Sequence, residues 1–279
     1  MSVLVILTIM GNLLVIAAVY KNTNLQTITN YFIVSLAVTD GLIGFGTFPT
    51  LLMIQRPGVF YATGTCFMLI VLSLTPYCVS IYNLFAIAVD RYIAIIYPLH
   101  HLRWVTAPRA KAVIVLTWIA SFLIMVGIVL LSKHSNYIEE IDCRLWNELI
   151  PLGVHILAFF TLFGIPLVIM IVMYIRIFLT ARKQMRIIRA QLQVSGQETV
   201  EIHGKLKSAV MPCVVLGAFV VCWIPQLIFM LHTETNYCTR YSFNVVADIF
   251  VVMNSAINPL IYGWYNKEFR HAFKKMVII

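Results

Sequence analysis

Several polar side chains lie in long apolar stretches of the chain, and they are the residues best suited to bind an ion or to switch partners. Asp40 lies in the run LAVTDGLIG, Asn12 in IMGNLLVI and Ser80 in CVSIYN. Asn254 and Asn258 are four residues apart in MNSAINPLIY, so they share one face of a helix. An ionisable or amide group surrounded by apolar residues is costly, so each of these positions needs an explanation.

The oxygens of Asp40, Ser80, Asn254 and Asn258 could surround a small cation, with Asp40 supplying the negative charge. Carboxylate, hydroxyl and amide oxygens are the ligands that hard cations prefer, which favours sodium. A hydrogen-bond network filled with water explains the same residues without an ion. Burial chemistry alone leaves both alternatives open.

Arg91 directly follows Asp90 near the end of the apolar run AIAVDRYIAII. A local acid–base pair that satisfies the end of a helix would explain this arrangement. An arginine that changes partner between two states of a helix bundle would explain it equally well. Spacing does not separate the two interpretations.

Composition indicates that these polar residues lie in long apolar helices. The 279 residues are 61% hydrophobic and 11% charged, with a mean hydropathy of +0.91, whereas soluble domains are about one quarter charged. We therefore predict an all-α membrane protein, a single domain over residues 1–279 with seven transmembrane helices. The predicted spans are Ser2–Tyr20, Thr29–Ile54, Ala62–Ile96, Lys111–Leu131, Leu149–Leu179, Lys207–His232 and Tyr241–Trp264.

The last segment, Asn266–Ile279, has a different pattern. Apolar residues recur at helical spacing, and Lys267, Arg270, Lys274 and Lys275 lie between them. This predicts an amphipathic helix on the surface of the membrane, in contact with its lipids.

Basic residues indicate the orientation of the chain. If the N-terminus is extracellular, sixteen of the 20 Lys and Arg residues are cytoplasmic, and only Arg56, Lys133, Arg144 and Arg240 are outside. This bias predicts a multi-pass protein of the plasma membrane with a cytoplasmic C-terminus. The longest polar linker, Arg182–Gly204, then lies in the cytoplasm.

Cysteine and proline positions predict a pinned outer loop and a bundle that moves. Cys66 and Cys143 both fall on the extracellular side, where oxidising conditions favour a disulfide between them. Prolines interrupt the backbone hydrogen bonds of several spans and bend them. They are Pro49, Pro76, Pro166, Pro225 and Pro259.

Other classes of protein fit poorly. The chain has no zinc-ligand motif, phosphate-binding glycine loop or nucleophile elbow, so we expect no enzyme activity. A net charge of +9 is typical of nucleic-acid binding, but the basic residues lie in short loops, and we expect no nucleic-acid partner. A membrane transporter is the alternative from another class, and the absence of an obvious internal repeat weighs against it.

Landmark residues in successive spans resemble those of the rhodopsin-like (class A) G-protein-coupled receptors. The resemblance covers essentially the whole chain and implies that an extracellular small-molecule agonist activates a cytoplasmic heterotrimeric G protein. The landmarks are Gly11-Asn12, Leu36-Ala37, Asp40, Cys66, Asp90-Arg91-Tyr92, Trp118, Pro166, Tyr174, Cys222-Trp223-Ile224-Pro225, Asn258-Pro259-Leu260-Ile261-Tyr262 and Phe269.

The resemblance also implies roles for individual residues. Trp223 would be the toggle beneath the ligand, and Ile81, Pro166 and Phe219 would repack between inactive and active states. Asp40, Ser80, Asn254 and Asn258 match the family's sodium pocket, which favours an allosteric sodium ion; no cofactor is obligatory. The cytoplasmic switches would be Asp90, Arg91, Tyr92, Tyr174 and Tyr262.

One position departs from the family pattern. The acidic residue that often holds the arginine from span six is replaced by Lys205, on ungapped counting from Trp223. We therefore expect no arginine lock of that kind and a raised basal activity.

The cytoplasmic half most resembles the adenosine receptors, in the stretches Leu25–Thr27, Thr29–Ala37, Leu84–Ile95 and Tyr174–Arg182. The ligand-facing half departs from them. Their asparagine of span six is Met230 here, and their histidine of span seven is Val252. Their loop phenylalanine and glutamate correspond to Leu145 and Trp146, so these departures weigh against adenosine itself.

The remaining ligand classes can be narrowed. The aspartate that binds amines in span three is Ser73 here, and the retinal lysine would fall at Val252. An apolar pocket with few polar groups predicts a small uncharged or lipid-like ligand. The candidate pocket residues are Ser73, Leu74, Tyr77, Leu145, Trp146, Ala158, Trp223, Leu227, Met230, Val251 and Val252.

Overall fold

Long apolar helices dominate the computed structural model, which describes residues 2–55, 61–130, 140–141, 152–195, 200–231 and 237–277. Seven helical segments are long and apolar enough to cross a membrane, which confirms the predicted all-α bundle. The spanning helices are α1 (Ser2–Lys21), α2 (Ile28–Gln55), α3 (Thr63–Ile96), α5 (Ala107–Leu130), α7 with α8 (Leu152–Phe159 and Ile165–Ser195), α9 (Val200–Leu231) and α10 (Tyr237–Tyr265).

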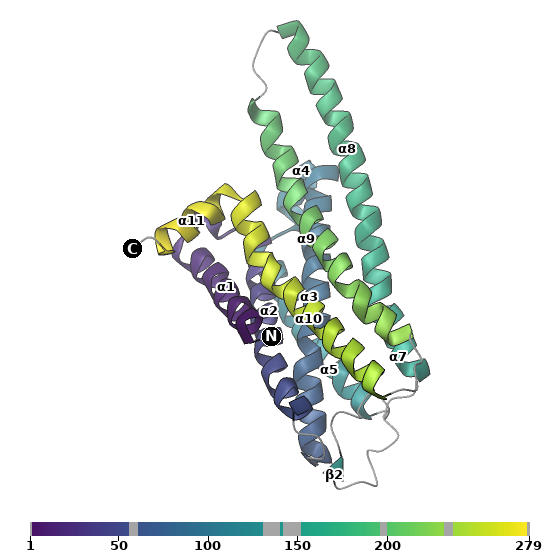
Figure 1. The fold of residues 1–279 in the computed structure, drawn as a ribbon. Coiled ribbons are helices and arrows are strands. Elements are labelled where there is room, and N and C mark those ends of the chain that lie inside the picture. The colour runs from purple at the N-terminus through teal and green to yellow at the C-terminus, as the bar shows by residue number, and fades with distance from the viewer. Residues whose placement is uncertain are drawn as a thin grey trace.

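Short elements mark the two ends of the bundle. Strands β1 (Tyr61–Ala62) and β2 (Glu140–Ile141) form an antiparallel pair at one end, which we call the strand end. The 3-10 turn Thr23–Leu25, helix α4 (Pro98–Trp104) and helix α11 (Lys267–Val277) lie at the opposite end, which we call the α11 end (Figure 1). Neither the strand pair nor α4 was predicted, because both are too short to produce a periodic pattern.

Helix α3 occupies the centre of the bundle. It contacts α2, α5, α8 and α9, whereas α1 contacts α2 and α10. Helices α5 and α8 are peripheral, and large apolar side chains such as Leu123, Ile171 and Phe178 are exposed on them. Apolar surfaces of this extent suit lipid rather than water.

The predicted polar linker Arg182–Gly204 is largely helical, which corrects the expectation. Helix α8 continues to Ser195 and α9 begins at Val200, and Figure 1 shows both helices extending beyond the rest of the α11 end. The residues after Arg182 are mostly Arg, Lys, Gln, Met, Ile and Ala, which are compatible with a helix whatever their charge. The polar side chains keep this segment out of the lipid, but they do not prevent it from forming a helix.

Proline shapes the join between α7 and α8. Residues Phe160–Gly164 form a π-helical turn that leads into Pro166. Pro166 has no backbone N–H to donate to the preceding turn, and a wider turn accommodates this gap. This turn carries Phe163, whose ring lies 4.8 Å from the Trp223 ring of α9.

Helix α11 packs back against the bundle through its apolar face. Phe269 and Ala272 are buried, and the Phe269 ring lies 5.6 Å from the Tyr262 ring of α10. The Asn266 side chain accepts a hydrogen bond from the backbone N–H of Glu268 at 2.9 Å, which caps the helix. Its lysines and Arg270 are exposed, as an amphipathic surface helix requires.

Candidate functional site

A buried carboxylate connects three helices at the α11 end. Asp90 is 2% exposed, and its Oδ2 lies 2.8 Å from Arg91 Nη2. Thr29 of α2 donates its hydroxyl to the same oxygen at 2.5 Å, and Arg91 donates in turn to Thr29. His101 Nε2 of α4 lies 2.9 Å from the other oxygen, Asp90 Oδ1. We call these four residues the Arg91 cluster.

The Arg91 cluster contains the local acid–base pair that the sequence suggested, together with two partners that it did not. Thr29 and His101 hold the carboxylate from either side, so Arg91 is fixed to α2 as well as to its own helix. Tyr174 of α8 lies close enough to Arg91 for an electrostatic interaction. A change of partner by Arg91 would therefore remove its contacts with Asp90 and with Thr29 of α2, while Asp90 would keep its own bonds to Thr29 and His101.

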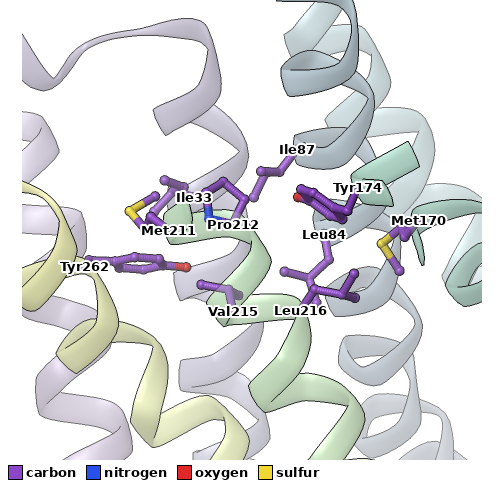
Figure 2. Close-up of a pocket in the computed structure, with 10 residues that line it drawn as sticks. All are labelled: Ile33, Leu84, Ile87, Met170, Tyr174, Met211, Pro212, Val215, Leu216 and Tyr262. Carbon is purple, nitrogen blue, oxygen red and sulfur yellow. The ribbon is translucent and has the colours of Figure 1, made fainter. Parts of the chain in front are cut away.

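Two tyrosines face each other beside this cluster. Tyr174 of α8 and Tyr262 of α10 line a small cavity, with room for about one water molecule. Figure 2 shows their hydroxyl groups directed towards one another across it. Tyr262 Oη is buried and has no hydrogen-bond partner among the described residues. Tyr92 does not line this cavity, and its ring lies 6.2 Å from the Tyr97 ring.

A second set of polar residues, which we call the polar centre, is buried midway along the bundle. Asn258 donates to Asp40 Oδ2 at 2.7 Å, joining α10 to α2. Asn12 of α1 donates to the Ser255 carbonyl at 3.0 Å, joining α1 to α10. Asn254 and Ser80 are also buried, the latter on α3, which contacts α2.

The polar centre contains several buried acceptors that are unpaired. Asp40 Oδ1, Asn254 Oδ1 and Asn258 Oδ1 are buried without hydrogen-bond partners in the described part of the chain. Buried oxygens of this kind are normally satisfied by a donor, a water molecule or a cation. A carboxylate with amide oxygens nearby fits a hard cation such as sodium.

Aromatic rings surround Trp223 on α9, nearer the strand end. The Trp223 ring lies 5.2 Å from Phe219, 4.8 Å from Phe163 and 5.9 Å from Tyr77, which meets it edge-on. These four residues form the aromatic cluster. Phe219 and Ile81 belong to one buried core, and Pro166 is buried on α8.

Comparison with known proteins agrees with this geometry. The sequence profile described as 7 transmembrane receptor (rhodopsin family) matches residues 11–262. The chain belongs to this family. It is a G-protein-coupled receptor of the plasma membrane and not an enzyme, and its partners are a small-molecule ligand and a G protein.

The curated relatives of the receptor include adenosine receptors. It is 34% identical to adenosine receptor A2a of Canis lupus familiaris, over 98% of this chain and 69% of the relative. It is 32% identical to the A2a receptor of Homo sapiens over the same shares. It is 34% identical to adenosine receptor A2b of Mus musculus, over 99% of this chain and 87% of the relative.

The predicted ligand-binding residues of the receptor differ in their burial and in their contacts. Tyr77 and Trp223 are in contact, and Ser73, Ala158 and Leu227 are half-buried. Leu74 packs into the apolar cluster between α3 and α5. Val251 and Val252 are almost fully buried on α10.

Some predicted residues lie beyond what the structure describes. Leu145, Trp146 and Cys143 lie outside the described residues, as does the side chain of Met230. Cys66 is disulfide-bonded. Because its predicted partner Cys143 is not among the described residues, the pairing of these two cysteines stays a prediction. Among the described cysteines, Cys78, Cys213 and Cys222 are free.

Sequence reasoning missed several residues at the receptor's sites. Phe163 packs against Trp223, and His101 contacts Asp90, but neither is a polar residue in an apolar run. Asn83, Gln226 and Asp248 do carry that signal and could have been found by it. Asn83 is 1% exposed on α3, three residues from Ser80.

Proposed function

We propose that the receptor binds a small extracellular molecule near the strand end and couples it to a G protein at the α11 end. The observation that carries this proposal is the Arg91 cluster, where Arg91 contacts Asp90 on its own helix and Thr29 on α2. Releasing those contacts would free the α11 end for a G-protein segment. The polar centre and the aromatic cluster lie between the two ends and would carry the change.

The orientation follows from charge. With the α11 end in the cytoplasm, the exposed Lys267, Arg270, Lys274 and Lys275 of α11 would face the anionic inner leaflet and bind membrane lipids there. The N-terminus would then be extracellular. The long extensions of α8 and α9 would reach into the cytoplasm, where a G protein could contact them.

We propose that the ligand differs from adenosine although the signalling half is adenosine-receptor-like. The relatives are named adenosine receptors, and the stretches that match them lie mainly near the α11 end. At the ligand end, Met230 and Val252 replace an asparagine and a histidine of that family. Two hydrogen-bonding groups for a nucleoside are thereby lost.

Sodium is proposed as an allosteric ion in the polar centre. Asp40, Ser80, Asn254 and Asn258 would hold it, because three of these residues present unpaired buried oxygens. The ion would supply positive charge to the Asp40 carboxylate. The residues themselves hold α2 and α10 together through the bond from Asn258 to Asp40.

The proposal can be tested by measuring cyclic AMP in cells that express the receptor. The cells are treated with adenosine and with a panel of lipids and amines. We expect a response that Arg91→Ala alters strongly and that adenosine elicits weakly or not at all. Lys21→Ala is the matched control, because Lys21 is an exposed basic residue at the end of α1. Signalling by Arg91→Ala equal to that of the Lys21→Ala receptor would contradict the mechanism.

A further inference from the structure

Asp248 is a second acidic residue within the bundle, distinct from Asp40. It lies on α10, ten residues before Asn258 and therefore about 15 Å from it along the helix, towards the strand end. Its side chain is half-buried. A carboxylate at this depth is costly in lipid and marks a functional site by default.

Helical spacing turns Asp248 towards the interior of the bundle. Val251, Val252 and Ser255 follow it at three, four and seven residues, and all three are buried. The carboxylate is also close enough to Tyr77 of α3 to interact with it electrostatically. Asp248 therefore faces α3 across the bundle, on the same side as the aromatic cluster.

No cation balances this carboxylate within the described part of the chain. Both ion pairs found there involve Asp90, at the other end of the bundle. A structural role for Asp248 would call for a lysine, an arginine or several hydrogen bonds close by. An unpaired carboxylate that remains partly accessible is instead suited to a ligand.

The neighbouring groups define the chemistry of that ligand. Gln226 lies on α9 one turn beyond Trp223, and its Oε1 is a buried acceptor without a partner among the described residues. Helix α9 packs against α10. Tyr77, which interacts electrostatically with Asp248, meets the Trp223 ring edge-on at 5.9 Å, so aromatic rings border the carboxylate and would pack against an aromatic ligand.

We propose that Asp248 binds a positively charged nitrogen of the ligand, so that the receptor selects small aromatic amines or amidines. This inference rests on the proposed receptor function and names the ligand class of the same site. It replaces the expectation of an uncharged ligand, which rested on Ser73 standing where amine receptors carry an aspartate. Here the carboxylate comes from α10 instead of α3.

Matched pairs of probes test the proposal on the purified full-length receptor. The pairs are 2-phenylethylamine with 2-phenylethanol, tryptamine with tryptophol, and benzamidine with benzamide, each measured by thermal unfolding and by affinity. We expect at least one cation to stabilise the receptor and to bind at least about tenfold more tightly than its neutral partner, because hydrogen bonds to charged groups are the strong ones.

Variants assign the preference to Asp248. Asp248→Asn should abolish the difference between partners, and Asp248→Glu should retain most of it, which separates charge from folding. Glu268→Gln, an exposed acid on α11, should keep the preference. Equal binding of the neutral partners, a preference that survives Asp248→Asn, or stabilisation by none of the cations would overturn the proposal.

Basal nucleotide exchange separates this inference from the proposed function. Exchange that depends on Arg91 without any cation preference would overturn the ligand class and leave the signalling mechanism standing. A cation preference that requires Asp248 without Arg91-dependent exchange would support the ligand class and contradict the mechanism.

Discussion

His101 Nε2 lies 2.9 Å from Asp90 Oδ1, so the short helix α4 contacts the same carboxylate that holds Arg91. A hydrogen bond to a charged group is worth about 1.5–3 kcal/mol. Removing it with His101→Ala should loosen the Arg91 cluster and raise agonist-independent nucleotide exchange several-fold. Exchange on a purified G protein measures this effect.

The adjacent histidine provides the control for that prediction. The His100 ring lies 4.8 Å from the Trp104 ring, tilted against it, and His100 is not bonded to Asp90 in the described structure. His100→Ala should therefore leave basal exchange close to that of the unmodified receptor. Equal basal exchange in the two histidine variants would show that His101 does not restrain Arg91.

Position 205 is where an acidic side chain could restrain Arg91. It lies near the beginning of α9, where ungapped counting places an acid in related receptors. Lys205→Glu should add an ion pair worth up to about 1 kcal/mol and lower basal exchange a few-fold. Lys207→Glu changes the same charge two residues further along the helix and should have less effect. Unchanged basal exchange in Lys205→Glu would refute a lock at this position.

Sodium should stabilise the receptor through Asp40. A ligand at five times its Kd adds about 1 kcal/mol to the free energy of unfolding. We therefore expect replacement of sodium by choline at equal ionic strength to lower Tm in the unmodified receptor. Asp40→Asn should remove this dependence, since the carboxylate supplies the charge. If the shift persists in Asp40→Asn, sodium acts elsewhere.

Cys66 should pair with Cys143. Peptide mass spectrometry without reduction should recover the two peptides as one linked species. Loss of the bridge in Cys143→Ser should cost about 2–5 kcal/mol of stability, because the loop it closes is long. Cys213→Ser removes a free, exposed cysteine and serves as the control. Recovery of Cys66 linked to Cys238 would contradict the assignment.

The seven helices and the polar residues within them can be predicted from the amino-acid sequence. A span needs about twenty apolar residues to cross the lipid, and each polar residue within it is energetically costly. Asp40, Arg91, Asn254 and Asn258 can therefore be recognised from residue type and position alone. The order of the landmark motifs also identified the family, which the comparisons confirmed. Asp248 carries the same signal, because it too is an acid within an apolar span.

Which of these residues contact one another depends on how the helices pack. Thr29 and Asp90 are 61 positions apart in the chain, and their bond depends on how far α2 and α3 are rotated and shifted along their axes. The same is true of Phe163 against Trp223 and of Asp248 facing Tyr77. Hydropathy predicts which segments lie in the lipid. Which side chains contact one another depends on the packing between helices, and the sequence of one segment does not determine that packing.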